Sequence, residues 1–543
     1  MQACDRATSD RFGVPSLDLM RAASSTVAAF VRVQFGGARR VTVLCGRGNN
    51  GGDGMMAARL LSGAGLEVTT LLLGPPDRLS GDAETAWGEL LASARPGTVQ
   101  VIERAGDLAR FAHLLEADLV IDAVLGTGFK PPLKGLALAV LEWLQPSAAP
   151  ILAVDLPSGW PADDTAAMQS IPVYPADAVL TFTAPKPAHV FGHLTRRWDQ
   201  PVVVAPIGSP DAALVSTQSL RWAGSSLALA QAARAATAHK GDFGHVLVIG
   251  GAMGTAGGKA GAPAMAALAA LRAGAGLVTA AVPAPALPLV AAAAPELMTW
   301  PLDASASGCI SEKNLAPEFL APLLAGKTVL AVGPGIGQSV ETVKFVTGLL
   351  ASSGLPAVID ADALNILAAE PVLLAKLARK RTLILTPHPG EMARLAGIRS
   401  AEVQAQRLEV ARNFAQRTGV TLALKGARTL IAHPDGAVAV NTSGNPGMAK
   451  GGSGDVLTGL IAGLLAQHPG EPGRAVEAAV ALHGLAADLA ARAADEHTLL
   501  ATDALRHLSA AFHFRPRAAN GYLWLQGMPA EAQQAATPRG AWR

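Results

Sequence analysis

Short apolar runs alternate with longer amphipathic stretches through the first 210 residues, and this alternation limits the folds that are open to the chain. The runs lie at residues 41–45, 68–73, 119–121 and 151–154, with a helical stretch at 55–62. A run that is apolar on both faces is typical of a strand in a parallel sheet covered by helices on both sides. The pattern therefore predicts repeated β-α-β units.

The same alternation starts again in the second half of the chain. Apolar runs recur at residues 246–249, 329–332, 357–359, 382–385 and 421–424, and an alanine-rich helix candidate lies at 260–273. We therefore predict the α/β class, with two three-layer domains in series.

Two segments lack the alternation and set the expected domain limits. Residues 209–238 lose the strand pattern, so we place the boundary near Leu214 and expect domains at 1–214 and 215–513. Residues 514–543 are rich in Pro, Arg, Gly and Gln, which predicts a flexible tail.

Charge and cysteine content exclude several classes of protein. The 543 residues carry 44 Lys+Arg against 42 Asp+Glu, without the long basic block that tracks nucleic acid. Three widely spaced cysteines fit a reducing compartment, and the first residues lack a secretory signal pattern. Residues 273–295 are uncharged but contain four prolines, which argues against a membrane span. We expect a cytoplasmic protein that binds neither nucleic acid nor membrane.

Polar side chains gather where three strands of the first domain are expected to end. Residues 46–54 hold five glycines at a strand-to-helix turn, without the spacing of the dehydrogenase GxGxxG fingerprint. Asp122 ends a second strand, and Asp155 and Ser158 follow a third. Ligands of open parallel sheets bind outside these strand ends, so the three loops predict one site rich in oxygen atoms.

These loops, together with residues 181–187, closely resemble the NAD(P)H-hydrate epimerase domain over most of residues 4–210. The resemblance implies a Rossmann-like fold, a potassium ion held by Asn50, Asp122 and Ser158, and Asp155 as the catalytic acid or base. The implied substrate contacts are Asn49, Asn50, Gly51, Gly52, Asp53, Gly126, Thr127, Gly128, Phe129, Lys130 and Asp155. Arg21 and Ser24 replace the Glu and Gly of the family's opening motif, which leaves a helix contact and dimer details open.

A run of small residues at 445–454 precedes Asp455 and the helix-like segment 456–461. Glycines let backbone N–H groups turn toward a phosphate, and a helix N-terminus adds positive partial charge. Asp455 lies where it can take a proton from a hydroxyl, so the pattern favours phosphoryl transfer. Residues 451–455 alone would equally fit an ordinary glycine-rich turn before a helix, with Asp455 as a carboxylate of the first helical turn.

Further motifs follow successive strands of the second domain, at residues 239–245, 332–337, 360–365, 386–391 and 424–429. Their order resembles the ribokinase-like fold and, more specifically, the ADP-dependent NAD(P)H-hydrate dehydratase over roughly residues 239–511. The resemblance implies that Mg²⁺ accompanies ADP and that Asp455 is the catalytic base. The implied nucleotide contacts are Lys425, Gly426, Ala427, Arg428, Thr429 and Gly454, and the implied contacts of the hydrated nicotinamide are Ala262, Gly335, His388 and Asp455.

Both resemblances imply one substrate class, the hydrates NADHX and NADPHX. The first domain would interconvert their R and S forms, and the second would convert the S form to NAD(P)H with ADP, releasing AMP and phosphate. We also expect a homo-oligomer. Two alternatives stay open at this point: a vitamin-type small-molecule kinase as the second domain, since Gly-x-Gly-Asp occurs there too, and a non-catalytic dinucleotide-binding module as the first.

Overall fold

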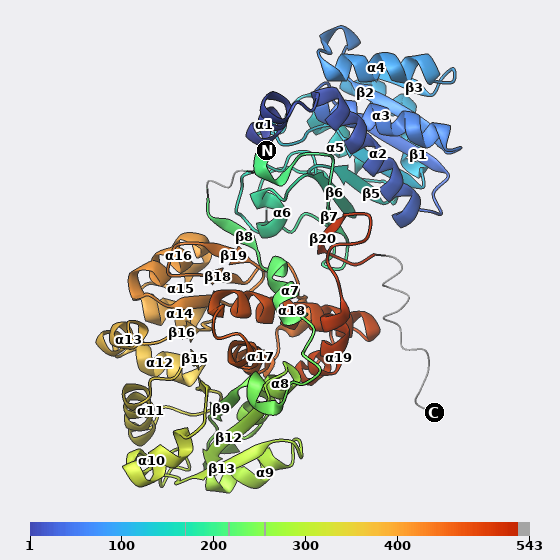
Figure 1. The fold of residues 1–543 in the computed structure, drawn as a ribbon. Coiled ribbons are helices and arrows are strands. Elements are labelled where there is room, and N and C mark those ends of the chain that lie inside the picture. Colours follow the sequence, from blue (N-terminus) through green and yellow to red (C-terminus); the bar gives the residue numbers. More distant parts are fainter. Residues whose placement is uncertain (169, 215–217, 255–256, 530–543) are drawn as a thin grey trace. The chain divides into compact units, whose positions relative to one another are not determined.

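The computed structural model describes residues 1–168, 170–214, 218–254 and 257–529, which form two compact units. Unit 1 takes in the described residues of Met1–Thr217 and Arg515–Arg543, and unit 2 those of Gln218–Phe514. Each unit has one large, mainly parallel sheet packed among helices (Figure 1). The predicted α/β class is confirmed.

Unit 1 contains an eight-stranded sheet in the order β20-β7-β6-β5-β4-β1-β2-β3, parallel throughout except for β20. Its strands are β1 Arg40–Cys45, β2 Glu67–Leu73, β3 Val99–Ile102, β4 Leu119–Ala123, β5 Ile151–Val154, β6 Ala178–Phe182, β7 Val202–Ala205 and β20 Leu523–Gln526. Its α-helices are α1 Gln2–Phe12, α2 Ser16–Gln34, α3 Asn49–Gly63, α4 Asp82–Ser93, α5 Leu136–Leu144 and α6 Pro187–Phe191.

Unit 2 contains a ten-stranded sheet in the order β13-β12-β9-β14-β15-β16-β17-β18-β19-β8. Its strands are β8 Leu220–Trp222, β9 His245–Ile249, β12 Leu277–Pro283, β13 Met298–Leu302, β14 Val329–Val332, β15 Ala357–Ile359, β16 Leu383–Leu385, β17 Thr421–Leu424, β18 Leu430–Ala432 and β19 Val438–Val440, and the short pair β10 Met253–Gly254 and β11 Gly257–Gly258 lies apart.

The α-helices of unit 2 connect and cover these strands. They are α7 Leu227–Ala230, α8 Gly261–Arg272, α9 Leu287–Ala291, α10 Pro317–Leu324, α11 Val340–Ser352, α12 Asp362–Ala368, α13 Pro371–Ala378, α14 Pro389–Ala396, α15 Ser400–Ala405, α16 Arg407–Thr418, α17 Ser453–Gln467, α18 Pro472–Ala493 and α19 Ala501–His513. Of the helices that the structure describes, none is both long and apolar enough to cross a membrane. The uncharged segment 273–295 contains β12 and α9 instead.

Two expectations about the connecting segments were wrong. Residues 514–543 were expected to form a loose tail, yet β20 pairs antiparallel with β7 at the edge of the first sheet (Figure 1); residues 530–543 lie outside the described chain. The linker also contributes β8, which pairs parallel with β19. Both strands are short edge strands, and β8 is only partly buried, so neither carries a long apolar run.

Three of the five glycines at the expected strand-to-helix turn lie inside helix α3, which already begins at Asn49. A Cβ atom on Gly51 would lie 1.8 Å from the Gly46 carbonyl oxygen, and one on Gly54 would lie 2.5 Å from the Ala123 Cβ. These glycines therefore let the first turns of α3 pack directly against the loop after β1 and against β4.

Strand β20 closes unit 1 through an aromatic cluster. Trp524 is 4% exposed, and its ring and that of Tyr522 lie 6.3 and 6.4 Å from the Phe30 ring of α2. We predict that Trp524→Ala lowers the free energy of unfolding of unit 1 by about 3–5 kcal/mol, because a large buried side chain is lost. Urea titration of the full chain measures this.

The matched control is Val33→Ala, also in unit 1, at a side chain that is 59% exposed. It should change the free energy of unfolding by less than about 0.5 kcal/mol. An unchanged unfolding midpoint for Trp524→Ala would show that β20 does not stabilise this unit.

Candidate active sites

A cavity of about 670 Å³ opens in unit 1 at the carboxyl ends of β1, β4, β5 and β6. Most of the residues predicted for the first site line it: Asn49, Asn50, Asp53, Gly126, Thr127, Gly128, Phe129 and Asp155. Gly51, Gly52 and Lys130 are not among its lining residues. The cavity is large enough for a nucleotide-sized ligand.

Asp155 carries the densest set of contacts in this cavity. It follows β5 with a φ of 67°, a left-handed conformation that costs energy for a residue with a side chain. Its Oδ1 accepts hydrogen bonds from Lys186 Nζ at 2.8 Å and Thr181 Oγ1 at 2.9 Å, and its Oδ2 accepts from the Thr127 N–H at 3.0 Å. Burial alone would raise the pKa of Asp155, but the Lys186 ammonium, His189 and the hydrogen bonds from Lys186 and Thr181 together hold this pKa below its usual range.

His189 holds the backbone on both sides of this ion pair. Its Nδ1 accepts from the Lys186 N–H at 3.0 Å, so its Nε2–H donates to the Asp155 carbonyl oxygen at 2.7 Å. Burial, with the Lys186 charge, lowers the pKa of His189 to about 4. The ring is therefore neutral at physiological pH, and it connects the backbone at Lys186 to the backbone at Asp155.

The sequence did not point to several residues that line this cavity or contact Asp155. Lys186 and Thr181 lie in the segment 181–187 that supported the resemblance, but their pairing with Asp155 spans 31 and 26 residues. Asp5 of α1 also lines the cavity, near Asp53, and no motif pointed to it. Burial raises the pKa of Asp53 well above its usual range, and the charges of Asp155 and Asp5 add to this.

Asn50, Asp122 and Ser158, the residues predicted to hold potassium, lie around the segment 124–126. Ser158 Oγ donates to Asp122 Oδ1 at 2.6 Å and accepts from the Leu125 N–H at 2.9 Å. A Cβ atom on Gly126 would lie 3.2 Å from the Asn50 side-chain carbon. Asn50 Oδ1 and Nδ2 are buried without a hydrogen-bond partner, which is costly for an amide.

The donor chemistry of these three residues fits an alkali ion. Asp122 is fully buried. Burial raises its pKa to about 6, although the hydrogen bonds from Ser158 act in the opposite direction and lower it. A cation beside Asp122 and the free Asn50 oxygen would relieve both penalties. The donors at Asn50, Asp122 and Ser158 are amide, carboxylate and hydroxyl oxygens, which suit a hard cation. In the described part of the chain, no group of three or more His, Cys, Asp or Glu side chains is arranged to hold a metal.

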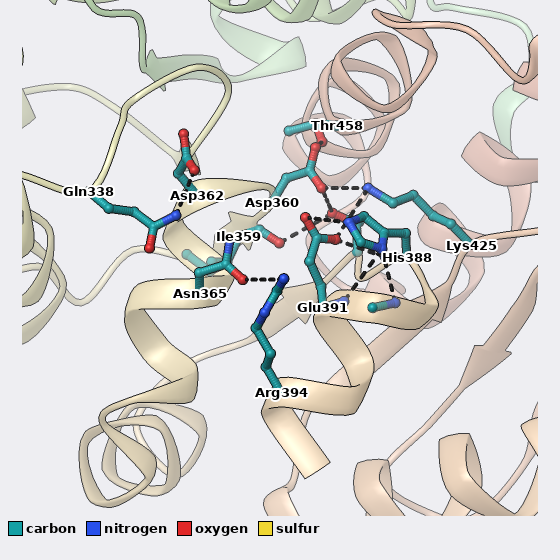
Figure 2. A network of polar contacts seen from close by, with 12 residues as sticks. Gln338, Ile359, Asp360, Asp362, Asn365, His388, Glu391, Arg394, Lys425 and Thr458 are labelled. Carbon is teal, nitrogen blue, oxygen red and sulfur yellow. Dashed lines mark hydrogen bonds and ion pairs between the residues drawn. The ribbon is translucent and has the colours of Figure 1, made fainter. Parts of the chain in front are cut away.

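In unit 2, Asp360 is the centre of a buried polar network (Figure 2). Its Oδ1 accepts from Lys425 Nζ and from Thr386 Oγ1, each at 2.8 Å, and its Oδ2 accepts from Thr458 Oγ1 at 2.8 Å. These partners come from the ends of β16 and β17 and from α17. The carboxyl ends of neighbouring parallel strands are thereby tied to one helix.

His388 and Glu391 extend this network at the start of α14 (Figure 2). The His388 N–H donates to Glu391 Oε2 at 2.8 Å, and that oxygen lies 3.9 Å from Lys425 Nζ. His388 Nδ1 accepts from the Gly390 N–H at 3.0 Å. Glu391 was part of a quoted motif but was not predicted as a site residue.

Asp455 lies in the first turn of α17, which begins after Gly452 with a left-handed φ of 96°. A Cβ atom on Gly454 would lie 3.3 Å from Lys425 Nζ, so the ammonium group borders the glycine cradle. Burial, reinforced by the charge of Asp360, raises the pKa of Asp455 to about 6. A carboxylate with this pKa is ionised at neutral pH and is a stronger base than an exposed one.

The other predicted residues of unit 2 fall into two groups. A Cβ atom on Gly335 would lie 3.2 Å from the Ala262 Cβ, so these two residues are neighbours, as a shared site requires. Lys425, Gly426, Ala427 and Thr429 follow β17 together. Arg428 is 8% exposed and its guanidinium donates to the Thr442 carbonyl oxygen at 2.8 Å, so this side chain is directed into the protein.

Two family models match the chain, one in each unit. The model described as YjeF-related protein N-terminus matches residues 16–188, and the NAD(P)H-hydrate dehydratase model matches residues 246–510.

Curated relatives match along nearly the whole chain. A bifunctional NAD(P)H-hydrate repair enzyme of Moorella thermoacetica is 42% identical, with 94% of each chain covered. The enzyme of the same name from Escherichia coli is 35% identical over 92% of this chain and 90% of its own length. Among solved structures, the ADP/ATP-dependent NAD(P)H-hydrate dehydratase of Bacillus subtilis, co-crystallised with ATP/Mg²⁺, is 32% identical and covers 55% of this chain and 99% of its own, with a TM-score of 0.45.

The buried pair of Asp155 and Lys186 generates a pH-dependent prediction. Replacing Lys186 with Met leaves the Asp155 carboxylate buried and unpaired, so its pKa rises above that of the unfolded chain. We expect Lys186→Met to lower the free energy of unfolding by about 3–5 kcal/mol at neutral pH. The deficit should shrink as the pH falls and Asp155 becomes protonated, and grow as the pH rises.

Denaturant titrations of the full chain between pH 5 and 8 measure this dependence. The double variant Lys186→Met/Asp155→Asn is the control, because it removes the unpaired charge and should recover most of the lost stability. A deficit that is constant across this pH range, or equal in the double variant, would contradict the pairing.

Proposed function

This chain belongs to the family of bifunctional NAD(P)H-hydrate repair enzymes, and from that premise we propose how its two units divide the reaction. Unit 1 interconverts the R and S hydrates of NADH and NADPH, and unit 2 dehydrates the S form with ADP. The observation that carries this proposal is that the similarity to the repair enzymes runs through both units, each of which has its own polar centre. We also propose a cytoplasmic homo-oligomer.

In unit 2, the reaction begins at the hydroxyl group on C6 of the hydrated nicotinamide ring. Asp455 takes the hydroxyl proton while the oxygen attacks the β-phosphorus of ADP, and the bond to AMP breaks with its electron pair leaving on AMP. The C6–O bond of the phosphate ester then breaks, phosphate leaves with that electron pair, and the ring nitrogen stabilises C6. Loss of a proton from C5 completes NAD(P)H.

The cradle before α17 supplies the charge stabilisation for this transfer. Backbone N–H groups at the helix N-terminus around Gly454 face a transferring phosphoryl group, and Lys425 borders them. The nucleotide contacts are proposed at Lys425, Gly426, Ala427, Thr429 and Gly454, with Arg428 contributing through its backbone. Ala262, Gly335 and His388 are proposed to line the hydrated nicotinamide.

Mg²⁺ is proposed to enter with ADP. Glu391 Oε2 lies 3.9 Å from Lys425 Nζ, and a carboxylate donor of this kind suits Mg²⁺. When bound, the ion neutralises charge on the phosphates.

In unit 1, epimerisation requires C6 to lose its hydroxyl group and regain it on the opposite face. The ring nitrogen leaves C6 with cationic character as hydroxide departs. Asp155, the proposed acid or base, is held ionised by Lys186, so it can stabilise that charge, take a proton from the water that adds to the opposite face and pass it to the departed hydroxide. Asn49 and Asp53 and the loop at Gly126–Phe129 are proposed to bind the dinucleotide. Gly51 packs against the Gly46 backbone and Gly52 against the Met20 side chain.

Chemically hydrated NADH tests the function directly. Incubation of the full chain with the hydrate and ADP, ATP or neither, followed by the return of the reduced-nicotinamide absorbance, should show repair with ADP and release of AMP. Formation of a stable phosphate ester without reduced nicotinamide would contradict the proposal.

Asp455 is the proposed base of the dehydration. Asp455→Asn should reduce dehydration by a factor on the order of 10² to 10⁴, since it removes the base and hardly changes shape. The variant should be at least as stable as the wild type at pH 8, because the buried wild-type carboxylate has a pKa of about 6 and is ionised there at a cost. Wild-type turnover would contradict the role of Asp455 as base.

Potassium is the ion proposed for unit 1. Replacing potassium with lithium should weaken epimerisation of the R hydrate, because lithium is too small for the proposed ligands Asn50, Asp122 and Ser158. Thermal denaturation gives a separate readout: potassium should raise the unfolding temperature of the wild type, but not that of Asn50→Leu. Equal stabilisation of both proteins, or bound zinc at this site, would contradict the assignment.

A further inference from the structure

Asp360 is wholly buried, and both of its carboxylate oxygens are occupied by three donors from different elements. Asp360 is 1% exposed, and Lys425, Thr386 and Thr458 each donate to it at 2.8 Å (Figure 2). Neither cradle residue, Gly454 or Asp455, is hydrogen-bonded to it. Its hydrogen bonds therefore reach the cradle through these partners, although its Oδ2 would lie 3.8 Å from a Cβ atom on Gly454.

Two of those donors, Lys425 and Thr458, lie close to Gly454 and Asp455. Lys425 Nζ is held where a Cβ atom on Gly454 would lie 3.3 Å away. Thr458 lies three residues after Asp455, on the same face of α17. One carboxylate thus fixes both the ammonium group and the helix that carries the base.

We propose that Asp360 is a positioning residue for phosphoryl transfer: it fixes Lys425 beside the cradle and anchors α17 through Thr458, so that Lys425 and Asp455 face the same phosphoryl group. This inference rests on the function proposed for unit 2. It assigns Asp360 no contact with substrate.

The charge of Asp360 also acts on Asp455. Burial is the larger cause of the raised pKa of Asp455, Asp360 adds to it, and Lys425 opposes it. The other titratable groups around Lys425 are Glu391, His388 and His483. Removing the Asp360 charge while keeping Lys425 should lower the pKa of Asp455 and make it a weaker base.

The test uses the full-length protein with hydrated NADH, ADP and Mg²⁺. In Asp360→Asn, kcat at pH 8 should fall at least about tenfold, because Lys425 and α17 lose their anchor. The acid limb of the kcat profile should move down by about one pH unit, since a like charge near Asp455 has gone. Carbon NMR titration of the Asp455 carboxyl group should show the same shift without any turnover.

Two further variants separate the anchoring of α17 by Asp360 from the effect of the Asp360 charge on Asp455. Thr458→Val keeps the Asp360 charge but cuts the bond to α17, so kcat should fall while the acid limb stays in place. Asp362→Asn removes a nearby carboxylate that accepts from Gln338 and the Gly337 N–H rather than from Lys425, so it should not move the acid limb.

The outcomes distinguish this inference from the proposed function. A wild-type protein that repairs no hydrate with ADP overturns the function itself. An active wild type with unchanged kcat and acid limb in Asp360→Asn overturns the positioning role alone. If Asp360→Asn does not fold, wild-type kcat in Thr458→Val overturns it.

Discussion

A buried carboxylate paired with a lysine organises each half of this molecule. Asp155 with Lys186 and Asp360 with Lys425 both have oxygen-to-nitrogen distances of 2.8 Å, and all four groups are largely shielded from water. Charges in such places are costly unless each is paired and hydrogen-bonded, and here threonine hydroxyls complete both sets. Because the four partners sit at strand ends, each pair fixes the edge of the sheet at which the site is formed.

Glycines let helices of both units pack closely against neighbouring backbone. Helix α3 begins at Asn49 against the loop after β1, and α17 lies so close to α8 that a Cβ atom on Gly459 would be 2.0 Å from the Ala266 carbonyl oxygen. Glycine is required at such contacts because any side chain would push the helix away. In unit 1, Gly51 and Gly54 belong to the run that suggests anion binding in the sequence, yet they serve this packing role.

The central strands and the residues of the strand-end loops could be predicted, since a strand buried on both faces must be a continuous apolar run, as β5 and β14 are. Edge strands escape this rule: β8 is half-exposed, and β20 joins the sheet of unit 1 from the far end of the chain. Asp155 and Asp455 stood in recognisable motifs. The roles of Lys186 and Asp360 could not be predicted, because pairing across 31 and 65 residues depends on how strands are ordered in the sheet.

The pKa values of the two site carboxylates are shifted in opposite directions, and this difference suits the two chemistries that we propose. Asp155 has a lowered pKa because a lysine is bonded to it, so it keeps its charge and is suited to stabilising a ring that becomes cationic. Asp455 has a pKa of about 6 because it is buried near Asp360 and lacks a bonded cation, so it accepts a proton more readily near neutral pH. The two proposed roles thus differ in where the lysine is bonded: directly to Asp155 in unit 1, and to Asp360, the neighbour of Asp455, in unit 2.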